Sequence, residues 1–587
     1  MNIIEKEQRY DCVVKNTLAN SGVDGKDMVF HVNPTDKYVT KTTTFLKNDG
    51  VKDSMEMLKE NVKEKNEISV LVDADQDGYS SAALMFRFIR DDLGHENINF
   101  IMHDDKKHGL TDGVMKKIED DKPDLLIIPD AASNDIGNLN LLIDKGISVI
   151  VIDHHEIEED NISEESNKHL YVLNNQTMLD VNKELTGVGM TYLYCKSYSE
   201  LNNLNIDVDK YLDLVSLGQT GDMSDLADKE LRYYVTKGLS NINNQFIKDT
   251  LLKKGKPLQP SSRDLSFSII SMVNSVTRVG TPDEKKTLFE AFINQSENKE
   301  VVEVRKKNKK TGKMDTIKTE MTVEEIALKE SEKVKNRQDR LKRELSNEIK
   351  KDLDYTQPIL LGIMEESEKG SINGLIANTL LSENNKPVLI LTRGENSFSG
   401  SARGYEPYIK DFKAWCIDTG LFTLAQGHAN AFGVSIPEEN MPKLRKLISE
   451  MEPNKDIDIV VDKVYSKPEP YDIEKIDKQL GVFGGKAPIP LLAYKNVKFN
   501  IACARTRGSV LTLFDNGLEF VSYGTRGTIL DEIEMNLTNN TFRVNIIGEP
   551  SMNDWGNTRK PQVVIKEIEI IPKETEDSDE EYDLYDF

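Results

Sequence analysis

Three short apolar runs along the chain each stop abruptly at an acidic residue. The runs and the acids that follow them are 70–72 before Asp73, 124–129 before Asp130 and 148–152 before Asp153. Segments with the spacing of amphipathic helices lie between and after these runs, at about 80–93, 111–119 and 136–145. Strands that alternate with helices predict a parallel sheet. Because ligands of such sheets sit outside the carboxyl ends of the strands, we expect the three acids to share one crevice.

Further titratable residues extend this group. Asp75 and Asp77 follow Asp73 and precede Gly78, His154 and His155 follow Asp153, and Asp222 ends a helix-like segment at 212–221. Any one of them alone is more often an ordinary surface residue, whereas the set predicts a metal site, since clustered carboxylates repel one another unless a cation lies among them.

An EF-hand calcium loop is the alternative reading of the spacing Asp73-x-Asp75-x-Asp77-Gly78. Such a loop needs a glutamate at its twelfth position and a helix before it. This chain has Leu84 at the twelfth position and a strand-like run before the first acid. The pattern therefore favours a metal site at a sheet edge.

The types of ligand narrow the choice of metal. Carboxylates with one or two imidazoles and no thiolate suit Mn²⁺ or Mg²⁺ better than structural zinc. The acids also exceed what one cation needs. Two ions bridged by a carboxylate are the usual arrangement for phosphodiester hydrolysis, so we expect two ions in one active site.

The amino-acid composition limits the classes of function that are possible for this chain. The chain has 587 residues, with 76 Lys plus Arg against 100 Asp plus Glu and a net charge of −24, so it is not a general electrostatic binder of nucleic acid. A polyanionic substrate would need local basic patches and metals. Four scattered cysteines fit a reducing cytosol, and the lack of a signal-peptide core or bilayer-spanning run predicts a cytoplasmic protein without membrane contact.

Patterning beyond the first domain predicts several further parts. A strongly basic segment at 305–313 reads as a hairpin, either a solvated turn or a strand-backbone contact. Residues 322–352 read as one long helix that Thr322 and Glu325 begin as a capping box. Alternating runs at 454–570 predict a β domain in which arginines lie beside aromatics, either as a base-stacking surface or as core; these residues are Arg505, Arg507, Arg526, Phe514, Phe520 and Tyr523.

At this point the chain resembles the DHH phosphoesterases, and within them the RecJ-like single-strand-specific exonucleases. The residues that carry the resemblance are Asp73–Gly78, Asp130, Asp153-His154-His155, Leu185–Gly189, Gly221-Asp222, Ile372–Asn378, Gly400–Arg403 and Gln426–Gly433, the last three groups resembling the associated DHHA1 domain. Two motifs depart from the family. Lys106-Lys107-His108-Gly109-Leu110 stands where the family often has Arg-x-x-x-Gly-Tyr-Gly-Leu, and Gln426-Gly427-His428 stands for Gly-Gly-His.

The resemblance implies a fold and a division of the chain. The expected class is α/β: a parallel-sheet DHH domain and a smaller α/β DHHA1 domain joined by a long helix, then an OB-like β-barrel. The expected parts are an N-terminal extension at 1–66, the DHH domain at 67–243, a connector with the basic hairpin and the long helix at 244–358, the DHHA1 domain at 359–453, the β domain at 454–570 and a disordered acidic tail at 571–587.

The resemblance also implies roles for residues. Asp75, Asp77, Asp130, His154 and Asp222 would hold two Mn²⁺ or Mg²⁺ ions, with Asp130 as the bridge. Asp73 and Asp153 would complete or orient this shell, and His155 would contact the scissile phosphate. The candidates for binding substrate are Ser401, Arg403, His428, Asn430, Arg337 and Lys106. Ser401 and Arg403 are expected in a loop bounded by Gly400 and Gly404 that could take the terminal phosphate, and ordinary solvent exposure is an equal interpretation of Arg337.

The function implied is a metal-dependent 5′-to-3′ exonuclease on single-stranded DNA. Two alternatives stay open at this point: a DHH phosphodiesterase of short oligoribonucleotides or cyclic dinucleotides, and a non-catalytic single-strand-binding factor. The acidic tail, which ends Tyr585-Asp586-Phe587, resembles the tip of single-strand-binding proteins that docks on repair enzymes, although a solubilising tail is the simpler interpretation. The sequence leaves open the choice between DNA and RNA.

Overall fold

In the computed structural model the chain forms two compact units. The first unit comprises 1–24, 348–480 and 488–587, and the second comprises 25–347 and 481–487. The structure describes residues 1–157, 168–294, 299–307, 314–365, 372–452, 458–479, 481, 483–484, 487–507, 510–523, 528–553 and 559–573. The predicted domain boundaries stay a prediction. Each unit is described by itself.

A five-stranded parallel sheet organises the second unit, in the order β3-β2-β4-β5-β6. Its strands are β2 (Ile68–Val72), β3 (Ile98–Met102), β4 (Leu125–Pro129), β5 (Ser148–Asp153) and β6 (Leu170–Asn174). Every residue of β2 and β4 is buried, as expected of central strands that are covered on both faces. The sheet confirms the predicted α/β class and adds β3 and β6 to the three strands that the apolar runs indicated.

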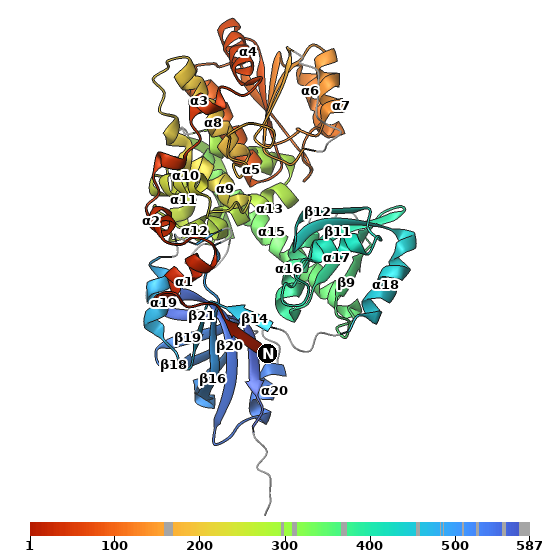
Figure 1. Ribbon diagram of the computed structural model, residues 1–587. Helices are drawn as coiled ribbons and strands as arrows, with labels where there is room; N and C mark the ends of the chain where they lie inside the picture. Colours follow the sequence, from red (N-terminus) through yellow and green to blue (C-terminus); the bar gives the residue numbers. More distant parts are fainter. Residues whose placement is uncertain are drawn as a thin grey trace, which may run out of the picture. The chain divides into compact units, whose positions relative to one another are not determined.

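Helices cover both faces of this sheet (Figure 1). Val70 and Val72 of β2 pack into a core with α4 (Val51–Glu64), α5 (Gln76–Arg87) and α8 (Gly187–Leu201). Leu71, which points to the other face, packs with α6 (Asp112–Asp121) and α7 (Ile136–Asp144). This alternation follows from the two-residue period of a strand.

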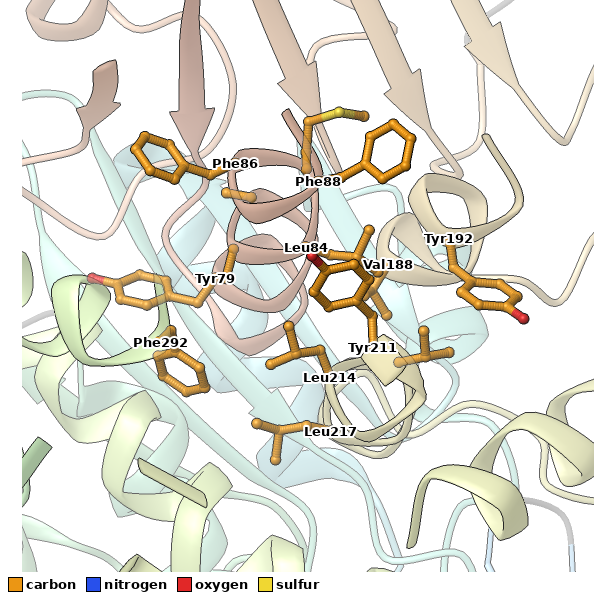
Figure 2. Close-up of a cluster of buried hydrophobic side chains, with 14 of the residues drawn as sticks. Tyr79, Leu84, Phe86, Phe88, Val188, Tyr192, Tyr211, Leu214, Leu217 and Phe292 are labelled. Atoms are coloured by element: carbon orange, nitrogen blue, oxygen red, sulfur yellow. The ribbon is translucent and has the colours of Figure 1, made fainter. Parts of the chain in front are cut away.

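Helix α5 is buried along its whole length and forms the centre of the larger core. Figure 2 shows Tyr79 and Phe292 on one side of this helix and Val188, Tyr211 and Leu214 on another. The Tyr79 ring meets that of Phe289 edge to face at 5.8 Å. Each such buried aromatic contributes roughly 1.5–3 kcal/mol relative to an exposed one, so the core holds the start of α5 firmly beneath the site.

The rest of the second unit is largely helical. Its further helices are α2 (Lys26–Val32), α3 (Thr42–Phe45), α9 (Leu212–Gly221), α10 (Lys229–Ser240), α11 (Gln245–Lys253), α12 (Ser262–Leu265), α13 (Ser271–Val279) and α14 (Pro282–Ile293). The basic segment forms the predicted hairpin of β7 (Lys299–Lys307) and β8 (Met314–Thr322), whose turn lies outside the described residues.

The predicted long helix is α15 (Val323–Asp352), which runs across the boundary between the units. Its capping box is present: the Thr322 amide donates to Glu325 Oε2 at 3.0 Å, and the Glu325 amide donates to Thr322 Oγ1 at 3.3 Å.

The first unit contains a second α/β layer with the strand order β12-β13-β11-β10-β9. Its elements are β9 (Leu360–Met364), α16 (Asn373–Asn384), β10 (Val388–Arg393), β11 (Ser397–Arg403), α17 (Phe412–Asp418), β12 (Leu424–His428), β13 (Ala431–Pro437) and α18 (Met441–Glu450). We expected Gly400–Arg403 in a glycine-bounded loop, and this was wrong. The segment lies in β11 and pairs with strands on both sides, because Gly400 allows the Ile390 carbonyl to approach where a Cβ would be 2.0 Å away.

Seven strands form the β domain, in the order β15-β16-β20-β21-β19-β18-β17. They are β15 (Lys463–Tyr465), β16 (Leu492–Asn500), β17 (Ala504–Arg507), β18 (Val510–Asp515), β19 (Leu518–Tyr523), β20 (Thr541–Asn553) and β21 (Lys560–Ile571), with helices α19 (Pro470–Asp477) and α20 (Thr528–Met535). Among the described residues no ladder joins β15 to β17, so closure into an OB-like barrel stays a prediction.

The aromatics of the β domain separate into core and surface. Phe520 is fully buried, which makes it a core residue, whereas the Tyr523 side chain is exposed and the Arg505 guanidinium lies 5.1 Å above the Phe514 ring. Arg526 lies outside the described residues. The stacking interpretation is therefore wrong for Phe520 and stays a prediction for Phe514 and Tyr523.

The N-terminal segment, in which the sequence shows no motif, belongs to both units. Strand β1 (Asn2–Glu5) pairs in parallel with β14 (Asp458–Val461), and α1 (Val13–Asn20) follows in the same unit, while 25–66 joins the α/β unit. The acidic tail from residue 574 lies outside the described residues. In the described part of the chain, no helix has the length and apolar character that a membrane crossing requires.

Candidate metal centre

Neighbouring strands of the parallel sheet all end on polar side chains. His103 follows β3, Asp73 follows β2, Asp130 follows β4, Asp153 closes β5 and Asn174 closes β6. Since parallel strands end at the same edge, this order brings the three predicted acids together, as the sequence indicated.

Asp77, Asp130 and His154 converge at one point of the site. The Nε2 atom of His154 lies 3.2 Å from Asp130 Oδ1 and 3.9 Å from Asp77 Oδ2. Both oxygens are buried, and neither has a hydrogen-bond partner among the described residues. Two orphaned carboxylate oxygens and an imidazole nitrogen that converge in this way are suitable ligands for a divalent cation.

Backbone geometry fixes these carboxylates. Asp77 Oδ1 accepts hydrogen bonds from Thr186 Oγ1 at 3.0 Å and from the Val188 amide at 3.2 Å, which leaves Oδ2 for the site. Glycine is required beside both acids: a Cβ at Gly187 would lie 2.3 Å from Asp130 Oδ1, and one at Gly218 would lie 2.2 Å from Asp77 Oδ1.

Electrostatics support the same fit. Burial, followed by the charges of neighbouring acids, raises the pKa of Asp130 well above its usual range. Burial raises the pKa of Asp77 to about 6, although His154 acts in the opposite direction. The pKa of Asp222, which follows α9, is raised to about 6 by desolvation and then by the charge of Asp75. These carboxylates are costly to ionise together without a cation.

Asp153 is placed to orient its neighbours. Its Oδ1 accepts from the His154 amide at 2.7 Å and from His155 Nδ1 at 2.7 Å, and its Oδ2 accepts from the Ser133 amide at 3.0 Å. The hydrogen bond to Asp153 raises the pKa of His155 to about 9, and the His155 side chain is half-exposed. The predicted role of Asp153 as a ligand stays untested, while its contacts fit the orienting role.

Asp73 is held in a similar way by residues that we did not predict. Its Oδ2 accepts from His108 Nδ1 at 2.5 Å, its Oδ1 accepts from the Gly109 amide at 3.0 Å, and buried His103 lies 3.4 Å away. Burial alone would raise the pKa of Asp73, but His103 and His108 lower it below its usual range. The apolar run at 98–102 ends on His103, and this signal could have identified the residue.

Asp75 caps α5 through a hydrogen bond from the Gly78 amide to its Oδ1, at 3.0 Å. The residues that could hold a metal form two groups whose ligand atoms lie within 4.8 Å of one another: one of Asp130, Asp153, His154 and His155, the other of Asp73, Asp75 and His108.

Two predicted substrate contacts lie elsewhere in the second unit. The Arg337 guanidinium donates to Glu284 Oε2 at 2.7 Å and to the Val279 carbonyl at 2.6 Å, so it is already occupied. Lys106 lies in the loop that carries His108. Contact with substrate stays a prediction for both residues.

The other predicted substrate residues lie in the first unit. Ser401 lines a pocket of about 330 Å³ together with Asn373 and Thr392. The buried Asn373 Oδ1 has no hydrogen-bond partner among the described residues. Arg403 donates from Nε to Asn378 Oδ1 at 2.8 Å, and the His428 side chain is exposed at the end of β12.

Asn430 differs from the other predicted substrate residues of the first unit in the contacts of its side chain. Its Oδ1 accepts from the Phe412 amide at 3.2 Å, and its Nδ2 donates to the Lys410 carbonyl at 3.0 Å. Both polar atoms thus bind the backbone, an arrangement that suits a structural role better than the predicted substrate contact.

Known proteins share this organisation. Residues 67–219 match the family model described as the DHH family, N-terminal domain. The Bacillus subtilis protein YorK, which carries the name of an SPbeta prophage-derived single-strand DNA-specific exonuclease, is 29% identical over 575 residues that cover 94% of this chain and 95% of that protein. The single-stranded-DNA-specific exonuclease RecJ of B. subtilis is 22% identical, covering 89% of this chain and 63% of RecJ.

Solved structures agree with the sequence relatives. RecJ from Thermus thermophilus in complex with Mn²⁺ superposes with a TM-score of 0.68 at 17% identity, over 97% of this chain and 79% of RecJ. The same protein with Mg²⁺ gives a TM-score of 0.62 at 16% identity. The fold, the site and the matched domain agree: residues 67–219 form a DHH-family domain, within a chain that is similar to RecJ over most of its length.

Proposed function

We propose that the chain is a metal-dependent exonuclease that hydrolyses the phosphodiester bonds of single-stranded DNA. The observation that carries the proposal is the convergence of Asp77 Oδ2, Asp130 Oδ1 and His154 Nε2 at the end of the sheet. The relatives that extend over most of this chain carry the names of single-strand-specific exonucleases, and this supports the substrate.

The residues fit two divalent cations, Mn²⁺ or Mg²⁺. When bound, such ions activate a water and polarise the scissile phosphate. Asp77, Asp130 and His154 would hold one ion, and Asp75 with Asp222 would hold the other, with Asp130 between them. His155 would donate a hydrogen bond to the phosphate, since Asp153 fixes its Nδ1 and leaves Nε2 for the substrate.

We further propose that digestion runs from the 5′ end. The support is the pocket lined by Ser401, which lies two residues before Arg403 on β11, and by Asn373, whose buried Oδ1 has no hydrogen-bond partner among the described residues. A guanidinium can bind a terminal phosphate through two hydrogen bonds. If this pocket binds the 5′-terminal phosphate of the strand, only the end of a strand can enter, and digestion starts at that end. Ser401 would assist through its hydroxyl group.

A comparison of four substrates tests the proposal. With Mn²⁺ present, a long single strand should be degraded to short products, whereas a blunt duplex, a cyclic dinucleotide and a linear dinucleotide should be degraded far more slowly. A chelator should stop the reaction. Preference for the dinucleotides would favour a small-substrate phosphodiesterase, and tight binding of the strand without turnover would favour a binding factor.

A further inference from the structure

The loop after β3 brings a third imidazole to the metal centre. His108 lies within 4.8 Å of a ligand atom of Asp75 and of Asp73, and its side chain is half-exposed.

Hydrogen bonding determines which ring nitrogen of His108 is available. Asp73 is acceptor-only when ionised, so His108 Nδ1 donates in their 2.5 Å hydrogen bond, and Nε2 is the ring nitrogen that a cation would bind in place of any proton there. Histidines that bind metals nearly always donate their other ring N–H to a carboxylate or a carbonyl. His155 and Asp153 repeat the arrangement at 2.7 Å on the other side of the site.

Hydrogen bonds to the backbone hold the loop that carries His108 in place. The Gly109 amide donates to Asp73 Oδ1 at 3.0 Å, and the Leu110 amide donates to Asp135 Oδ2 at 2.7 Å. Asn138 Nδ2 donates to the Leu110 carbonyl at 2.7 Å. A ring held by such contacts loses little entropy when it binds an ion, which favours a ligand over a solvent-exposed side chain.

We propose that His108 Nε2 is a ligand of the second divalent cation, on the Asp75 side of the centre, and that Asp73 orients His108 without binding the ion. This inference deepens the proposed function and rests on its metal centre. Each ion then has one imidazole, His154 for the first and His108 for the second. An imidazole ligand disfavours Mg²⁺, so the second position should prefer Mn²⁺.

Titration of the metal-free full-length protein with Mn²⁺ tests the inference, with free Mn²⁺ followed by its electron paramagnetic resonance signal. The wild type should bind two ions. His108→Ala should weaken one of them by about tenfold or more and leave the other unchanged, and Asp73→Asn should weaken the same ion, because outer partners of ligand histidines contribute about 10–100-fold to metal affinity. His169→Gln, which removes an exposed histidine far from the sheet end, is the control.

A second readout keeps the test decisive if His108→Ala does not fold. In that case His108→Gln, which retains the size of the side chain, should show the same loss of one ion and fewer nitrogen couplings to bound Mn²⁺ in pulsed spectra. Unchanged affinity and couplings in the folded variant would overturn the inference. A wild type that binds two ions and degrades no single strand would overturn the proposed function and leave this inference standing.

Discussion

At the residue scale, the site combines acids for which burial favours the neutral form with acids for which their partners favour the ionised form. Burial raises the pKa of Asp77 and Asp130, whereas histidine partners lower the pKa of Asp73 and Asp153 despite their burial. Asp77 and Asp130 each keep one buried oxygen without a hydrogen-bond partner among the described residues, whereas both oxygens of Asp73 and of Asp153 accept hydrogen bonds from His108, His155 and backbone amides. The surroundings of each acid thus distinguish Asp77 and Asp130, the proposed metal ligands, from Asp73 and Asp153, the proposed orienting residues.

The raised pKa of Asp77 predicts a link between pH, metal and stability. Between the unfolded pKa of about 3.9 and the folded value of about 6, the unfolded state releases the proton while the folded state keeps it, so the stability of the metal-free protein falls as pH rises. The cost at neutral pH is on the order of 3 kcal/mol. A bound cation reverses it, and the rise in Tm on adding Mn²⁺ should be larger at about pH 7.5 than at about pH 5.

Asp77→Asn removes the same charge and provides the matched variant. Without metal at neutral pH it should melt at a higher temperature than the wild type, and Mn²⁺ should raise its Tm less. Thermal scans of both proteins with and without Mn²⁺ measure this. A metal-free variant no more stable than the wild type would show that Asp77 is not strained by its burial.

The sequence identified the acids at this scale because carboxylates at strand ends are visible in the pattern. It did not identify His103, His108 or Asn373, because their importance depends on contacts between segments distant in sequence. His103 reaches Asp73 only because β3 pairs with β2, and the tautomer of His108 depends on Asp73 across 35 positions of chain.

At the element scale, the start of α8 is built to admit the Asp130 side chain. A Cβ at Gly187 would lie 2.3 Å from Asp130 Oδ1 and 2.4 Å from its Cβ, closer than packed atoms approach. Gly187→Ala should therefore displace Asp130, reduce the Mn²⁺-dependent rise in Tm and lower nuclease activity by at least about tenfold.

Gly113→Ala in α6 is the control for this substitution. A Cβ there meets nothing within 4 Å, so alanine should be neutral or stabilise the helix by about 0.5–1 kcal/mol. The two variants are compared by thermal scans and by the rate of nucleotide release. An equal effect of both substitutions would mean that clearance beside Asp130 is unimportant.

Arg403 lies in strand β11 and not in the loop that its glycine-rich sequence suggested. A strand holds its guanidinium more rigidly than a loop would, and a Cβ at Gly374 would lie 2.7 Å from Arg403 Nη2. Arg403→Ala should weaken binding of 5′-phosphorylated strands by about 1.5–3 kcal/mol, the scale of a charge-assisted hydrogen bond, and should affect 5′-hydroxyl strands much less.

Exposed Arg445 on α18 gives the charge-matched control for this test, and Arg445→Ala should leave both affinities unchanged. Binding is measured with each strand type in the absence of turnover. If Arg403→Ala weakens both strand types equally, the terminal phosphate is held elsewhere.

Helix and strand periodicity predicted the central strands β2, β4 and β5, the helices α5, α6, α7 and α9, and α15 with its cap. The errors came from tertiary context. Glycine and small polar residues at 400–403 suggested a loop by local preference, but pairing with β10 and β13 on either side decided the strand. The first strand of the chain was missed because its partner, β14, lies more than 450 positions away.

At the scale of the whole molecule, we expect the binding of long strands and the catalytic chemistry to depend on different parts of the chain. Arg505 and Arg507 lie on the edge strand β17, with Arg505 above the Phe514 ring. The double variant Arg505→Ala/Arg507→Ala should bind long single strands more weakly and lower the salt dependence of binding by about 1–2 released counterions, because fewer phosphates are contacted.

The same variant should cleave short oligonucleotides at the wild-type rate. Arg445→Ala/Lys446→Ala, on exposed positions of α18, changes the net charge equally and should leave the salt dependence unchanged. Affinities measured over a series of salt concentrations make the comparison. If the salt dependence of binding is identical for the wild type and the β17 variant, β17 does not contact the substrate.

The central claim is that Asp130, at the end of β4, makes this chain a metal-dependent single-strand exonuclease. The most direct measurement is the rate of nucleotide release from a single strand labelled at either end, with Mn²⁺ present, for the wild type and for Asp130→Asn, which keeps the shape of the side chain and removes its charge. The wild type should release nucleotides progressively from the 5′ end, and the folded variant should lose at least about 10³-fold in rate, as expected when an electrostatic contribution of about 4 kcal/mol is removed from a transition state. Substantial activity in the folded variant, or no degradation of single strands by the wild type, would refute the proposed function.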